Sequence, residues 1–192
     1  MLAGRGQSLI IHYLSKVLSL VIVGLVIAAL AAILMIAASY QMLASQFGSA
    51  ALATIPDWCW RNLQIASGIQ LVSLLTVILL GSFAGVVLRS GTLGMIIALG
   101  WFPLENLIVL FTQLLMVKSS NLQVLRVTSY LLGPNLNHLH NAWESHRGPV
   151  IIFSEPDSLF SGPWQAGLVI AVYDVLLLAF GVGSLVMRDV KE

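Results

Sequence analysis

The sequence predicts an all-α membrane protein: a polytopic helical bundle of about four transmembrane helices, with short helices in a long external loop. The 192-residue chain is 58% hydrophobic and only 9% charged, and its mean hydropathy is +0.95. A soluble domain carries about 25% charged residues, so a chain this poor in charge could not cover a water-facing surface. Four separate apolar stretches, each long enough to cross a bilayer, divide the chain.

The four predicted spans are 17–39, 66–88, 93–117 and 165–187, and they form a single transmembrane domain over 1–192. A helix needs about 20 mostly apolar residues to cross a hydrocarbon core about 30 Å thick. Each span must be helical, because lipid cannot satisfy the backbone N–H and C=O groups of an isolated strand. The first stretch is too long for a cleavable secretory signal, so we interpret it as a retained span.

The positions of Lys and Arg predict a multi-pass protein of the plasma membrane with both termini in the cytoplasm. In this orientation the inside cations lie in short stretches next to the spans: Arg5, Lys16, Arg89, Arg188 and Lys191. The other four cations are spread over two long outer segments, which cross the membrane largely regardless of charge. The short turn that contains Arg89 therefore decides the orientation.

The outer segments are 40–63 and the long external loop 118–164. Within the loop, 122–132 is apolar enough to lie in the membrane interface or to dip back into the membrane. Gly133-Pro134 is predicted to end this stretch, and 135–146 has the pattern of a short amphipathic helix. A loop of this length in so compact a protein is typical of a functional segment.

Two acidic residues fall near the middle of predicted spans, Glu105 in the third and Asp174 in the fourth. A carboxylate at the bilayer centre costs about 2.5–3.5 kcal/mol on insertion scales, so such residues usually face the protein interior. Glu105 precedes Asn106 and follows Pro103, which predicts a broken or kinked helix. Either Glu105 is a gate or pathway residue, or it bonds a carbonyl freed by the proline. For Asp174 we favour a packing hydrogen bond over a place in a pathway.

Small residues recur at four-residue spacing on two spans, which indicates close helix packing in lipid. These candidate contact residues are Gly24, Ala28 and Ala32 on the first span, and Gly81 and Gly85 on the second. The spacing does not distinguish packing within the chain from packing against a second copy.

The sequence gives no support for chemistry on this chain. Cys59 is the only cysteine, so there is no internal disulfide and no Cys-based metal site. His138, His140 and His146 fit a solvated loop helix better than a metal site, because residues two apart lie on different helix faces. The chain has neither a G-x-x-x-x-G-K-[ST] nor a G-x-S-x-G motif. With a net charge of +1 and no basic block, nucleic acid is not an expected partner.

Five features, in order along the chain, resemble the permease subunits of type-2 ABC transporters. The segments GRGQS (4–8) and HYLSK (12–16) are similar to the cytoplasmic approach to that family's third helix. GSFAGVVLRSGT (81–92) resembles its small-residue helix end and tight Arg-containing turn, and GWFPLE (100–105) resembles its next helix, which commonly holds an acid.

The last two features are the long external segment with short helices and the closing VMRDV (186–190), which resembles the family's terminal helix and tail. The resemblance covers nearly the whole chain. It departs from the family in lacking the first two of six spans and most of the cytoplasmic coupling helix between them. Either the chain is a shortened or truncated member, or another subunit supplies those helices.

The resemblance implies alternating access along a path between two permease chains, as a homodimer or heterodimer, with an ABC-type ATPase on a separate chain. Glu105, Asn106 and Asp174 are the path or gate candidates, and the ATPase-contact region is Arg5, Gly6, Gln7 and Ser8. The chain itself would be no enzyme and would need no cofactor. Two alternatives stay open: a non-transporting accessory or scaffold subunit, and a proton- or ion-coupled carrier, for which the chain lacks two related halves.

Overall fold

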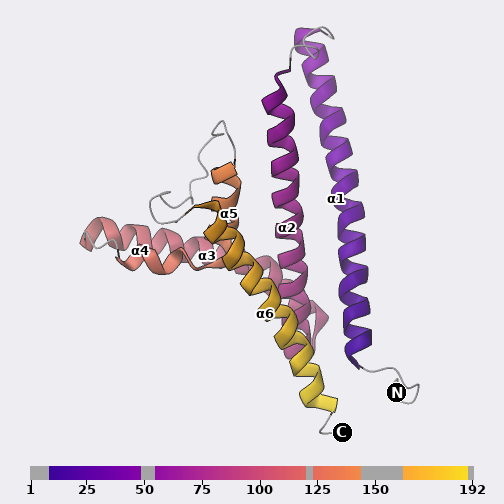
Figure 1. Cartoon of the computed structure of the whole chain (residues 1–192), viewed down its shortest axis with the longest axis vertical. Coiled ribbons are helices and arrows are strands. Elements are labelled where there is room, and N and C mark those ends of the chain that lie inside the picture. Colours follow the sequence, from indigo (N-terminus) through magenta and orange to yellow (C-terminus); the bar gives the residue numbers. More distant parts are fainter. Residues whose placement is uncertain (1–8, 49–54, 120–122, 144–161, 190–192) are drawn as a thin grey trace.

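The chain folds as an all-α protein, as predicted. The computed structural model describes residues 9–48, 55–119, 123–143 and 162–189, and all elements in these ranges are helices. In chain order they are α1 (Leu9–Phe47), α2 (Asp57–Val87), α3 (Gly91–Ser119), α4 (Gln123–Thr128), α5 (Leu132–Trp143) and α6 (Pro163–Asp189) (Figure 1). The four long helices are long and apolar enough to cross a membrane, which makes the chain a multi-pass membrane protein and confirms the predicted number of spans.

The first two long helices are longer than the predicted spans. α1 has 39 residues and α2 has 31. At 1.5 Å per residue they measure about 58 and 46 Å, well beyond a hydrocarbon core of about 30 Å. Much of the predicted outer segment 40–63 is therefore helical. The residues that extend α1, YQMLASQF, are rich in Gln, Met, Leu and Ala, which favour helix.

α1 and α2 form a long antiparallel pair, whereas α3 runs across their direction in Figure 1. α6 and α5 both pack against α2, and α5 packs against α3 and α6 as well. α1 begins and α6 ends at the same end of the molecule, as an even number of crossings requires. α5 is thus held among three of the four long helices.

A tight turn joins α2 to α3 and fixes how they cross. Arg89 adopts a left-handed conformation with φ 56°. The N–H of Ser90 donates to the carbonyl of Gly85 (3.0 Å), and that of Arg89 donates to Val86 (3.3 Å). This pattern is a Schellman cap with Arg89 in the position that glycine usually takes. The hydroxyl of Ser90 then accepts the N–H of Leu93 (3.3 Å), so one residue closes α2 and caps α3.

The turn brings the backbones of α2 and α3 into direct contact at three glycines. A Cβ on Gly94 would lie 2.7 Å from the Gly85 nitrogen and closer still to the Gly81 carbonyl oxygen. A Cβ on Gly81 would lie 3.2 Å from the Cβ of Ala98. Of the predicted contact residues, Gly81 and Gly85 therefore lie in a contact within the chain.

Two clusters of buried apolar side chains hold the long helices together. One joins α2, α5 and α6 and consists of Ile69, Leu132, Leu136, Leu139, Ala166 and Ile170. The other joins α1, α2 and α6 and consists of Tyr13, Val17, Leu79, Leu80 and Leu177. Tyr13 and Val17 are the only buried residues of α1 among those described, so almost all of α1 faces away from the bundle.

Tyr13 is a polar residue in an apolar contact. Tyr13 is 5% exposed, and its hydroxyl has no hydrogen-bond partner among the described residues. A Cβ on Gly181 would overlap with that hydroxyl, so Tyr13 of α1 packs directly against the glycine backbone of α6 here.

Tyr13→Phe is expected to raise the stability of the protein in detergent by about 1 kcal/mol, because a buried hydroxyl without a partner costs about 1–3 kcal/mol. Thermal unfolding of the wild type and the variant measures the difference. Tyr40→Phe, at an exposed position of the same helix, is the matched control and should change nothing. A clearly destabilised Tyr13→Phe protein would mean that the hydroxyl has a partner.

Candidate functional site

Glu105 lies near the middle of α3, is 2% exposed, and binds the backbone at the start of α5. The N–H of Leu132 donates to its Oε1 (3.2 Å), and the N–H of Gly133 donates to its Oε2. A Cβ on Gly133 would lie 2.8 Å from Oε2, so a larger residue here would displace the carboxyl group from this position. The partners of Glu105 are N–H groups of another helix, not a carbonyl freed by Pro103, and α3 is not broken at the proline.

These bonds complete the first turn of α5. The first N–H groups of a helix have no partner inside the helix. Glu105 accepts hydrogen bonds from the N–H groups of Leu132 and Gly133. Pro134 has no N–H group, and the N–H of Asn135 donates to the carbonyl of Leu131 (3.4 Å). The carboxyl group also meets the positive end of the helix dipole.

The prediction that Gly133-Pro134 ends the apolar stretch 122–132 was wrong, because both residues lie inside α5. Both residues belong to the first turn of α5, where a proline is tolerated because its missing N–H is not needed. The break falls instead at 129–131, between α4 and α5.

The carbonyls of this break are satisfied by two side chains. Asn135, which is fully buried, donates its Nδ2 to the carbonyls of Ser129 (2.7 Å) and Leu131 (2.6 Å). The hydroxyl of Tyr173 on α6 donates to the carbonyl of Tyr130 (3.2 Å). We call Glu105, Asn135 and Tyr173, with the backbone 129–133, the hairpin anchor.

The hairpin anchor places a non-helical turn against the interior of the bundle. Glu105 is near the middle of α3, and Tyr173 is in the central part of α6. Non-helical backbone at membrane depth is tolerated only where it is buried in protein or lines a water-filled cavity. The hydrogen bonds of the anchor meet this requirement. The stretch predicted to lie in the interface or to dip back into the membrane is thus tied to two spans.

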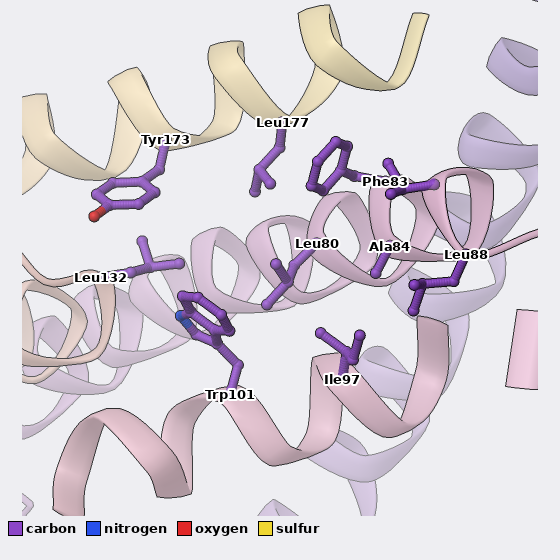
Figure 2. Close-up of a pocket in the computed structure, with 10 residues that line it drawn as sticks. Leu80, Phe83, Ala84, Leu88, Ile97, Trp101, Leu132, Tyr173 and Leu177 are labelled. Atoms are coloured by element: carbon purple, nitrogen blue, oxygen red, sulfur yellow. The ribbon is translucent and has the colours of Figure 1, made fainter. Parts of the chain in front are cut away.

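An apolar cavity of about 330 Å³ lies beside the anchor, between α2, α3 and α6 (Figure 2). Figure 2 shows Leu80 from α2, Trp101 from α3 and Leu177 from α6 around it, with Leu132 at the start of α5 at one side. Nothing charged lines it. Leu132, at the start of α5, is therefore in contact with both the buried cluster and this cavity.

Asp174 lies in a different place, between α2 and α6. It is half-buried, the side chain of Thr76 on α2 lies beside it, and its Oδ1 has no hydrogen-bond partner among the described residues. Asp174 lines an open groove of about 620 Å³ between the two helices. A packing hydrogen bond of Asp174 stays a prediction. The adjacent Tyr173 serves the hairpin anchor instead.

The remaining predicted residues are distributed over the fold. Asn106 is half-buried on α3. A Cβ on Gly24 would lie 3.1 Å from a methyl of Leu74 on α2, whereas Ala28 is half-buried and Ala32 is exposed. Arg5, Gly6, Gln7 and Ser8 lie outside the described residues.

Neither Asn135 nor Tyr173 was singled out from the sequence as a site residue. The signal for Asn135 was the sequence Leu-Gly-Pro-Asn, which fits a helix start with a proline in the first turn. Nothing local marks Tyr173, because its partner is 43 residues away. Of His138, His140 and His146, His138 is buried in α5, so the prediction of a solvated helix was wrong for this residue. No group of three metal-ligand side chains occurs in the described part of the chain.

Comparison of the chain with models of known families, with curated proteins and with solved structures gives no match, so the site rests on its own geometry.

Proposed function

We propose that this chain is the membrane-spanning permease subunit of an ATP-driven, ABC-type transporter whose ATPase is a separate chain. The observation that carries the proposal is the hairpin anchor: an interrupted helical segment held among the long helices by Glu105 and Tyr173. Such interruptions are typical of channels and transporters, where irregular backbone lines a path. The class of transporter comes from the resemblance to type-2 permeases.

In the proposed mechanism the α4–α5 segment moves together with α3 and α6. Glu105 and Tyr173 bond its backbone, so a tilt of either helix is transmitted to the turn at 129–131. The neighbouring apolar cavity gives Leu132 space to move. Glu105 and Asn106 lie near the path, and ATP binding on the partner subunit supplies the free energy that shifts the population of states.

The proposal includes the plasma membrane, cytoplasmic termini and pairing with a second permease chain. The short α2–α3 turn exposes the cation Arg89, which favours the cytoplasmic side for this turn. The long apolar face of α1, with Leu34 and Met35 about 70% exposed, has the composition that lipid or another permease helix would cover.

Purification of the tagged full chain in mild detergent is expected to recover a P-loop ATPase subunit in a fixed ratio. Replacing 5–8 by four alanines should abolish this recovery while helix content and elution volume stay unchanged. Lys16→Ala, an exposed cation on α1, is the matched control and should retain the partner. Mass spectrometry of the eluate gives the readout, and a folded, homogeneous chain without any ATPase would contradict the proposal.

A second candidate is a non-transporting accessory subunit, which the purely structural use of Glu105 favours. An accessory subunit would co-purify with another membrane chain and without a P-loop ATPase. Glu105→Gln separates the two functions, because a transporter should lose flux in liposomes with its complex intact. In an accessory subunit the same change should alter assembly alone.

A further inference from the structure

The groove between α2 and α6 has a shape and a chemistry that the proposed path does not use. Trp164 and Gln64 line one end of it, and Asp174 lines it further along α6. At 1.5 Å per residue, Trp164 and Asp174 are separated by about 15 Å along the helix axis. The volume of about 620 Å³ falls within the range of roughly 300–1,000 Å³ that is usual for sites of drug-sized ligands.

The wall between the two ends is apolar and unobstructed. Ile69, Val72 and Ile170 contribute its surface. Gly68 of α2 and Gly167 of α6 also line it, and a Cβ on either would meet nothing within 4 Å. The two glycines therefore open the groove and are not required for close packing of the helices.

The acid in the groove has unused hydrogen-bonding capacity. Thr76 is fully buried, and its hydroxyl already donates to the carbonyl of Val72 (3.1 Å). The Oδ1 of Asp174 accepts no hydrogen bond from any described residue. No cation lines the groove among the described residues. A carboxyl group in such surroundings gains most from a ligand that brings a positive charge and donors.

We propose that this groove binds amphiphilic amines of drug size, with the ammonium group at Asp174 and the apolar body along α2 and α6. Charge complementarity selects an ammonium, because pairing with Asp174 offsets the cost of a charge in lipid. The volume selects a drug-sized molecule over a two-chain phospholipid. Trp164, an 84% exposed residue, lies at the other end, where its ring can cover the tail. Binding does not depend on the chain being a transporter.

Binding is tested with the purified full chain in nanodiscs of phosphatidylcholine. The probe is a primary alkylamine with a fluorophore on its tail, and its N-acetylated analogue is the neutral control. Fluorescence anisotropy should show saturable binding of the amine and at least tenfold weaker binding of the analogue. Asp174→Asn should weaken amine binding by about 10- to 100-fold, the usual range for a lost charge-assisted bond. Asp57→Asn, at an exposed acid outside the groove, should bind as the wild type does.

A second pair of variants tests the place of binding. Gly68→Leu and Gly167→Leu should block the groove and abolish amine binding, whereas Gly100→Leu, at an equally open glycine outside it, should not. Any of four results would overturn the proposal: no saturable binding, equal affinity for amine and analogue, loss of binding when phosphatidylethanolamine is added, or leucine variants that change only the oligomeric state. A missing ATPase partner would leave it standing.

Discussion

Glu105→Ala is expected to lower the free energy of unfolding by about 2–6 kcal/mol, because it leaves two buried N–H groups unpaired at about 1–3 kcal/mol each. Those groups belong to Leu132 and Gly133 and lie in the interior of the bundle. A chain of this size loses roughly 2–4 °C in melting temperature per kcal/mol, so the shift should be at least about 4 °C. Hydrogen exchange should show that these two amides lose their protection while α2 keeps its own.

Two further variants sharpen this test. Glu105→Gln keeps one carbonyl oxygen and turns an NH₂ toward the other N–H, so about half of the loss is expected. Leu107→Ala changes a half-exposed residue of the same helix and should change stability little. If Glu105→Ala melts like Leu107→Ala, the carboxyl group does not hold α5.

Gly94→Ala is expected to separate α2 from α3. The added Cβ would lie 2.7 Å from the Gly85 nitrogen and 2.8 Å from its Cα, and backbone atoms cannot rotate away as side chains do. Overpacking of an interior costs about 1–3 kcal/mol, and a clash with backbone belongs at or above the upper end. Thermal unfolding and size-exclusion chromatography should show a destabilised and heterogeneous protein.

Gly100→Ala is the control on the same helix, because a Cβ there meets nothing within 4 Å. Alanine favours helix over glycine by about 1 kcal/mol in soluble hosts, so this variant should be neutral or slightly stabilised. Equal behaviour of the two variants would show that the glycine contact between α2 and α3 is not tight.

The number and type of the long helices could be predicted, because length and apolarity alone decide whether a helix can cross a bilayer. The ends of the helices could not. α1 continues to Phe47 because its last residues favour helix whether or not lipid surrounds them. α5 begins at Leu132 because a side chain from another helix satisfies its first N–H groups.

The candidate site could be predicted in part. An acid in the middle of an apolar stretch is costly in lipid, so Glu105 and Asp174 could be singled out from the sequence. The partners of Glu105 could not be, because hydrogen bonds over 27 or 28 residues depend on how the helices pack. Asn135 was missed because a Gly-Pro pair was interpreted as a loop, although it also fits the first turn of a helix.

The distant origin of the α5 cap has a consequence for biogenesis. Helices with a cap in their own sequence can form as soon as they leave the ribosome. The carboxyl group that caps α5 is made 27 residues earlier and is present when α5 is synthesised, but the phenol that bonds the preceding turn is made 43 residues later. The full set of hydrogen bonds around the α4–α5 segment can therefore form only after α6 has been synthesised.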